Sequence, residues 1–158
     1  MAVSRDRDAL AMSADELLAF MDAAFERELT WRIESLDAGH VTVRQPTSGG
    51  DLRPGGTVSG PTLMGLADGA AYLMVLARIG PQALAVTSNL NINFLRRPRP
   101  GDLLARATLL KLGRTLALVE VAISSDGHPD PMAHAVVTYS LALVDGTGPD
   151  AHQNGAPT

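Results

Sequence analysis

The chain has 158 residues, a length that suits one domain with a single hydrophobic core. It contains no cysteine, which excludes disulfides, thiol nucleophiles and thiolate metal sites, and its net charge of −4 argues against general nucleic-acid binding. The 46% hydrophobic and 19% charged fractions are ordinary for a soluble globular protein. The first residues alternate in charge and lack the apolar stretch of a secretory signal, so we expect a cytoplasmic protein.

The N-terminal part of the sequence predicts a tail, a helix and two short strands. Residues 1–12 are expected to form a flexible tail. Ser13 and Glu16 have the spacing of a capping box, which opens an amphipathic helix. Thr30–Ser35 and His40–Gln45 then have the pattern of two strands joined by a turn.

The rest of the sequence predicts one long helix followed by four strands. A loop rich in glycine, serine and proline precedes Pro61, which suits the first turn of a helix that ends near Gly80. Short separators that could turn an antiparallel meander divide four strand-like runs, at residues 83–95, 102–112, 116–124 and 132–144. Residues 146–158 have the composition of a disordered tail, which leaves 13–145 as the single domain.

Asp68 is the only charged side chain between Arg53 and Arg78, in the middle of the long apolar helix. Burying an unpaired carboxylate in an apolar setting costs several kcal/mol of folding free energy, so we expect Asp68 to have a chemical role or a bonding partner that offsets this cost. It could serve chemistry, or it could be capped by amides at a helix or subunit contact. A stripe without large side chains runs beside it, made of Pro61, Gly65 and Gly69. The helix has nearly membrane-spanning length, but its central carboxylate and glycines argue against lipid.

A basic segment follows the helix. Six of the thirteen basic residues lie within it, opposed only by Asp102: Arg96, Arg97, Arg99, Arg106, Lys111 and Arg114. In an acidic protein this clustering indicates a small anionic ligand. A solvated basic face that balances acid elsewhere is the alternative interpretation.

The order of elements predicts an α+β fold, in which one antiparallel sheet wraps around the apolar helix to bury it. In the first strand after that helix, strict alternation places Thr87 with Asn89, Asn91 and Asn93, on the face opposite Leu90. The histidines lie away from Asp68 and have no zinc-site spacing, so we expect neither a Ser-His-Asp triad nor a metal.

This layout resembles the hotdog fold, and roughly residues 40–144 resemble the PaaI-like acyl-CoA thioesterases of the phenylacetate-degradation type. In that family a His-Gly-Gly triplet opens the helix and an acid follows nine positions after the His. Here Ser59-Gly60-Pro61 occupies the triplet and Asp68 has the required spacing. The segments NINFLRRPRPGD and KLGRTLALVEVAI resemble the family's next blocks.

The resemblance implies hydrolysis of an acyl-CoA, with no cofactor beyond the coenzyme A of the substrate. Asp68 would be the general base or the nucleophile, the Gly60 N–H would polarise the carbonyl, and Thr87 would help to hold the water. Substrate contacts would come from Ser59, Pro61, Leu63, Met64 and Met74, and from Arg96, Arg97, Arg99 and Arg114 near the phosphates. Ser59 is the expected N-cap of the helix rather than a catalytic group.

The helical rise places Gly60 and Asp68 about 12 Å apart, too far to flank one carbonyl. This spacing predicts a homodimer or homotetramer with sites shared between subunits, as the resemblance also implies. Ser59 stands where the family has His, Pro61 replaces the second Gly, and Arg53 takes the place of an Asn or Gln. These departures leave open a non-catalytic hotdog protein that binds acyl-CoA or a related anion. A hotdog hydratase is a third hypothesis, which the absence of a His beside the acid disfavours.

Overall fold

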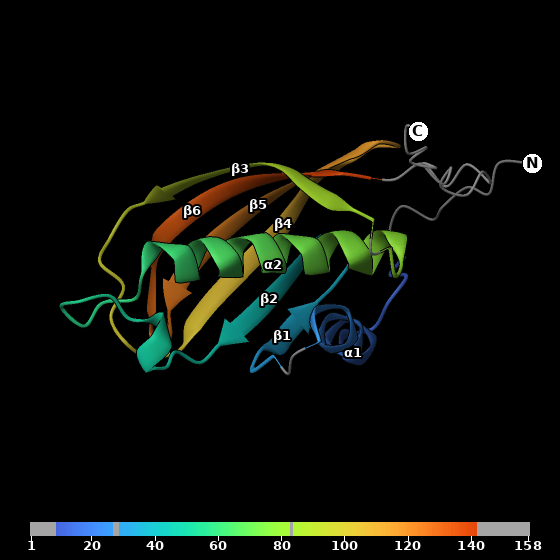
Figure 1. Cartoon of the computed structure of the whole chain (residues 1–158). Coiled ribbons are helices and arrows are strands. Elements are labelled where there is room, and N and C mark those ends of the chain that lie inside the picture. Colours follow the sequence, from blue (N-terminus) through green and yellow to red (C-terminus); the bar gives the residue numbers. More distant parts are fainter. Residues whose placement is uncertain (1–8, 27–28, 83, 142–158) are drawn as a thin grey trace, which may run out of the picture.

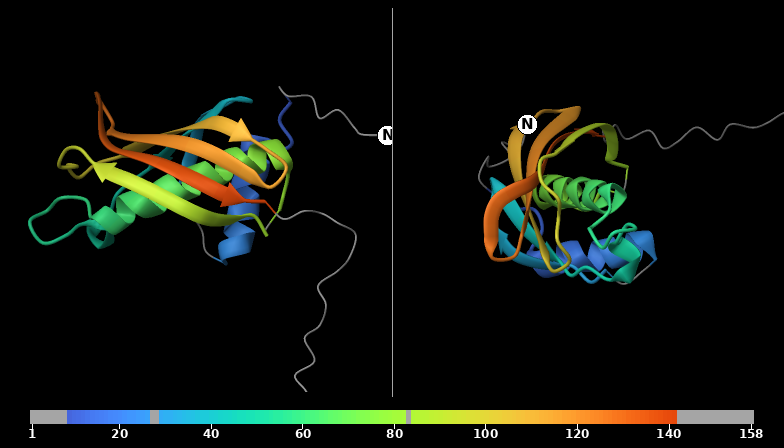
Figure 2. Two further views of the ribbon diagram at one scale, coloured as in Figure 1. Left: turned by 90° about the horizontal axis from the view of Figure 1, so that it is seen from above. Right: turned by 90° about the vertical axis from the view of Figure 1, so that its left-hand side faces the viewer.

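The computed structural model describes residues 9–26, 29–82 and 84–141. Their elements are α1 (Ala14–Phe25), β1 (Arg32–Leu36), β2 (His40–Gln45), the 3-10 helix η1 (Gly49–Asp51), α2 (Gly60–Ile79), β3 (Val86–Phe94), β4 (Leu103–Leu112), β5 (Leu116–Ser125) and β6 (His128–Ser140). The strands form one antiparallel sheet in the order β1-β2-β4-β5-β6-β3. The sheet curls around α2, and α1 lies beside the end of α2 that is nearer its C-terminus (Figure 1 and Figure 2). This is the hotdog fold that the sequence predicts.

Local signals at both ends of α2 explain where it begins and ends. Ser59 caps its N-terminus by accepting a hydrogen bond from the Thr62 N–H, and Pro61 stands in the first turn, where its missing N–H costs nothing. Gly80 ends the helix with a φ of 90°, a backbone conformation that residues other than glycine rarely adopt. Both boundaries agree with the sequence prediction.

α2 is the centre of the hydrophobic core. By length and composition it could cross a membrane, but 61% of its most apolar window is buried inside the protein, as expected for a core helix. Small side chains on the facing strands, such as Ala105, Ala107 and Ala135, allow it to approach the sheet closely. The largest fully buried side chains on α2 are Leu63, Leu66, Leu73, Met74 and Leu76. Each contributes roughly 1.5–3 kcal/mol by leaving water.

A β-bulge in β3 changes which face Thr87 occupies. The register shifts between Thr87 and Asn89, so that Thr87 lies opposite Tyr139 and Leu90 lies opposite Val137. Thr87 therefore faces α2 together with Leu90, and Val86 faces away and is 56% exposed. The expectation that Thr87 shares a face with the asparagines was wrong, because the extra residue of a bulge reverses the alternation.

Two boundaries also differ from expectation. β6 begins at His128 rather than near residue 132, because Gly127 has a φ of 77° and completes a tight turn. Ala11 and Met12, which the sequence assigned to the tail, are held against the domain: the Ala11 N–H donates to the Ala77 carbonyl at 2.7 Å, and Met12 is 6% exposed. The expected C-terminal tail, 146–158, lies outside the described residues.

Candidate active site at Asp68

The carboxylate of Asp68 is held on one oxygen by two hydroxyl groups. The Thr87 hydroxyl, from β3, donates to Asp68 Oδ1 at 2.7 Å. The Tyr139 hydroxyl, from β6, lies 2.8 Å from the same oxygen and 3.0 Å from the Asp68 carbonyl. Within the described residues, Oδ2 accepts no hydrogen bond from the protein. One oxygen is therefore fixed, and the other is left for water or substrate.

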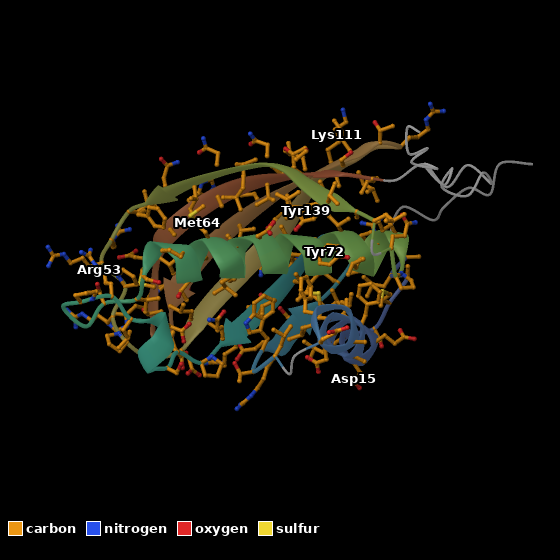
Figure 3. The ribbon with its side chains drawn as sticks, in the orientation of Figure 1. Asp15, Arg53, Met64, Tyr72, Lys111 and Tyr139 are labelled. Atoms are coloured by element: carbon orange, nitrogen blue, oxygen red, sulfur yellow. The ribbon has the colours of Figure 1, made fainter. Side chains whose placement is uncertain are left out.

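Tyr139 holds Asp68 from inside the core. Its side chain is 3% exposed and its ring stacks on Tyr72, with centroids 5.5 Å apart and planes 11° apart. Figure 3 shows both rings beside the middle of α2. Burial raises the pKa of Tyr139, so its hydroxyl stays protonated and donates. Burial also raises the pKa of Tyr72, whose hydroxyl donates to the Gln82 carbonyl at 3.3 Å instead.

Sequence reasoning missed Tyr139, although one signal was available. The residue alternates with Val137 and Ala135 on the inward face of its strand. A buried tyrosine hydroxyl needs a partner, and Asp68 is the one carboxylate that the central helix offers.

The N-terminus of α2 carries an unused backbone donor. The Gly60 N–H makes no hydrogen bond within the described part of the chain, and Pro61 has none to offer. The Ser59 hydroxyl is occupied: Thr62 N lies 3.3 Å and Thr62 Oγ1 2.9 Å from its oxygen. Ser59 is thus the N-cap, as predicted. The unbonded Gly60 N–H and the helix dipole together favour negative charge here.

β3 runs beside both elements. A Cβ at Gly60 would lie 3.4 Å from Phe94 Cζ, at the end of β3, whereas Asp68 bonds to Thr87 near its start. Gly60 and Asp68 therefore face opposite ends of one edge strand. Met64 lies between them along α2 and is 42% exposed (Figure 3).

A pocket of about 730 Å³ adjoins Asp68, a size typical of small-molecule sites. Most of its polar lining lies near the N-terminus of α2: Thr47, Ser48, Asp51, Ser59 and Thr62. Its apolar lining comes from α1, the segment after it and the core: Met21, Phe25, Leu29, Trp31 and Leu66. The stripe of Pro61, Gly65 and Gly69 also lines it. The expected acyl-pocket residues Leu63 and Met74 do not; both are fully buried under the sheet. Met64 also lies outside it.

One subunit does not bring the four predicted phosphate-binding arginines together. Arg96, Arg97 and Arg99 lie in the exposed loop before β4, and Arg96 Nη1 donates to the Pro131 carbonyl at 2.7 Å. Arg114 lies beyond the far end of β4, a ten-residue strand that spans about 30 Å. Figure 3 shows Arg53 at one end of the molecule and Lys111, near the end of β4, on its other half. Arg53 is exposed and does not line the pocket.

Metal ligands do not gather anywhere in the described ranges: no three His, Asp or Glu side chains lie close enough to hold an ion.

Comparison with known proteins identifies the family. The thioesterase superfamily model matches residues 55–131. A candidate thioesterase of known structure from Silicibacter sp. TM1040 is 42% identical, with a TM-score of 0.76 over 83% of this chain and 92% of that one. A phenylacetic acid degradation-related candidate thioesterase from Ralstonia eutropha JMP134 is 28% identical, with a TM-score of 0.67 over 77% and 98%.

A third structure carries a ligand. A Streptococcus mutans UA159 protein solved with bound acetyl-CoA is 25% identical, with a TM-score of 0.64 over 72% of this chain and 90% of that one. The family model and the 42% identical relative agree with the hotdog fold. The chain belongs to the thioesterase superfamily, as a PaaI-like hotdog protein, and is a thioester hydrolase.

Proposed function

We propose that the protein hydrolyses an acyl-CoA to the free acid and coenzyme A, with Asp68 as general base or nucleophile. The observation that carries this proposal is the carboxylate itself, fixed through Oδ1 by Thr87 and Tyr139 while Oδ2 accepts nothing from the protein. The related protein with bound acetyl-CoA supports coenzyme A as the carrier.

In this proposal Asp68 supplies the base and the Gly60 N–H supplies the oxyanion site. Water attached to Oδ2 adds its oxygen to the thioester carbonyl carbon, and Oδ2 takes the proton. The carbonyl oxygen becomes an oxyanion, which the Gly60 N–H stabilises. When the oxyanion collapses, the carbon–sulfur bond breaks, and the departing sulfur takes up the proton. In the nucleophilic variant Oδ2 attacks first and water then hydrolyses the mixed anhydride. Thr87 acts by orienting Asp68, since its hydroxyl is bonded to that carboxylate.

Two subunits complete the site in this proposal. β3 is an edge strand of nine residues, and exposed large apolar side chains lie at or beside its ends: Leu84, Val86, Phe94 and Leu95. Such an edge invites pairing with a second copy. Antiparallel pairing about a two-fold axis near Leu90 would bring the Phe94 end of β3 to the Thr87 end in the partner. Gly60 of one subunit would then face Asp68 of the other, which resolves their 12 Å separation along one helix (about 1.5 Å per residue).

The same pairing explains the scattered arginines. Arg114 lies at the end of the sheet where β3 begins, because the Leu141 N–H donates to the Thr115 carbonyl and Val86 pairs with Ser140. In the dimer that end meets the loop containing Arg97 and Arg99 from the other subunit. We therefore propose that the phosphates of coenzyme A bind between the subunits, on arginines from both.

A thiol-release assay against short, medium and aromatic acyl-CoAs tests the proposed activity. Enzymatic release of coenzyme A from at least one of them is expected. The Ser59 hydroxyl is engaged in capping and Arg53 lies away from the pocket, so neither substitutes for the family's side chains, and the proposal places the chemistry on Asp68 and the Gly60 N–H. Saturable binding of acyl-CoA without thiol release would refute the proposed hydrolysis of acyl-CoA.

A further inference from the structure

We propose that Trp31 is the specificity-determining residue of this site, the wall that limits how long an acyl group the pocket behind Asp68 accepts. The inference rests on the proposed function, because it concerns the acyl group of the same thioester.

Trp31 lies directly on the backbone of α2. A Cβ added at Gly69 would be 2.1 Å from Trp31 Cη2 and 2.7 Å from Cζ3, closer than real Cβ atoms approach other heavy atoms. The indole thus occupies space that only glycine leaves free, one residue after Asp68. Gly65, one turn earlier on the same stripe, has open space at that position. Gly69 therefore serves to seat Trp31, and Gly65 leaves part of the pocket empty.

Two contacts keep the indole from swinging aside. Trp31 Nε1–H donates to Gln45 Oε1 at 2.9 Å, which ties the ring to the end of β2. The next residue, Arg32, begins β1 and pairs with Arg44 of β2, so the backbone is fixed as well. A large ring with two rotatable bonds, held at both ends, makes a rigid boundary.

The position of this boundary suits the acyl group. Asp68, Gly69 and Trp31 line the same pocket, and its further apolar side chains come from Met21, Phe25 and Leu29. A thioester with its carbonyl at Asp68 would place its acyl chain along the bare Gly65 side and against the indole. A short acyl group would end before the ring, and a medium-length or aromatic one would contact it. Longer chains would have to displace it.

Fluorescence tests the contact without altering Trp31, because it is the only tryptophan in the chain. Asp68→Asn protein, which should bind without turnover, is titrated with free coenzyme A, acetyl-CoA, octanoyl-CoA and phenylacetyl-CoA. We expect octanoyl- and phenylacetyl-CoA to shift the Trp31 emission, and free coenzyme A and acetyl-CoA to leave it unchanged. Binding of all four, measured by calorimetry, with no difference in emission among them would overturn the inference.

Activity provides the second test. Trp31→Leu should raise the ratio of kcat/KM for dodecanoyl-CoA over octanoyl-CoA by on the order of tenfold, since a few methylenes in an apolar pocket are worth at least that much. Leu110→Ala, a truncation of a half-exposed side chain on β4, is the matched control and should keep the wild-type ratio. An active Trp31→Leu enzyme with the wild-type ratio would refute the role of Trp31 and leave the proposed hydrolysis intact. Wild-type protein that neither binds nor cleaves any acyl-CoA would refute both.

Discussion

Removing the Tyr139 hydroxyl should slow hydrolysis without disturbing the core. Tyr139→Phe keeps the buried ring and its stack on Tyr72, and deletes only the hydroxyl that donates to Asp68, at Oδ1 and at the backbone carbonyl. The carboxylate then depends on Thr87 alone. Because Asp68 has to hold one orientation while Oδ2 reacts, losing one of two tethers should lower kcat and leave KM nearly unchanged.

The size of the effect follows from the bond that is lost. A hydrogen bond to a charged group contributes about 1.5–3 kcal/mol net. At 1.36 kcal/mol per tenfold in rate, full loss of that contribution in the transition state corresponds to a fall in kcat of about 10- to 100-fold. Burial raises the pKa of Tyr139. The hydroxyl therefore stays protonated below about pH 9, and the ratio of wild-type to variant kcat should be constant there.

The matched control is Tyr72→Phe. It makes the same substitution in the same ring pair, but the Tyr72 hydroxyl bonds to the Gln82 carbonyl and not to Asp68. Steady-state kinetics of both variants, with melting curves of each, separate positioning from packing. If Tyr139→Phe lost no more kcat than Tyr72→Phe, the reasoning that the hydroxyl positions the carboxylate would be refuted.

Three further predictions concern assembly, binding and stability. The protein should sediment as a dimer or larger, and Val86→Glu on the edge strand should shift it toward monomer with loss of activity. Replacing Arg97 and Arg99 by Ala should raise KM for acyl-CoA on the order of tenfold at unchanged kcat, with a smaller effect in high salt. The Arg44 guanidinium, bonded to Asp126, lowers the pKa of that carboxyl. The pair therefore stabilises the fold above about pH 4 and less as pH falls, so Arg44→Met should lower the melting midpoint at neutral pH and have less effect in acid.

Each of these has a control and a contrary result. Leu110→Glu places the same charge on an exposed apolar site of β4 and should leave the assembly intact; a stable, active wild-type monomer would contradict the shared site. Arg106→Ala, on the outer face of the sheet, should not change KM, whereas a collapse of kcat in the double arginine variant would contradict a binding role. For Arg44, a difference in melting midpoint that stays constant down to about pH 3 would contradict the ion-pair explanation.

The sequence was most informative where structure is decided locally. The caps of α1 and α2, the position of Asp68 in the middle of a core helix, and the edges of most strands follow from residues a few positions apart. The sequence also showed that Gly69 belongs to a stripe without large side chains, but it did not show why a glycine is needed there. The Trp31 ring packs against Gly69 from 38 positions earlier in the chain (69 − 31), and a contact between residues so far apart leaves no local sequence pattern.

What the sequence could not reveal depended on pairing and on distance in space. The bulge after Thr87 is defined only against β6, so strict alternation assigned that side chain to the wrong face. Tyr139 stands at an inward-facing position of β6, where any large apolar residue would fit the alternating pattern. The pattern therefore did not predict its contact with Asp68. The arginines are close in sequence, but the ten-residue strand β4 carries Arg114 away from Arg96, Arg97 and Arg99, and the proposed dimer is what would bring them together.

The central claim is that the carboxylate of Asp68 performs the chemistry rather than supporting the fold. Asp68→Asn tests it, because the amide oxygen can still accept from Thr87 and Tyr139 but can neither take a proton nor attack a carbonyl. Thioesterase rate, melting midpoint and oligomeric mass are measured on one sample of the variant. The rate should fall by about 100- to 10,000-fold, with mass and midpoint close to wild type. A folded, oligomeric Asp68→Asn protein that hydrolyses its best acyl-CoA at nearly the wild-type rate would contradict the claim.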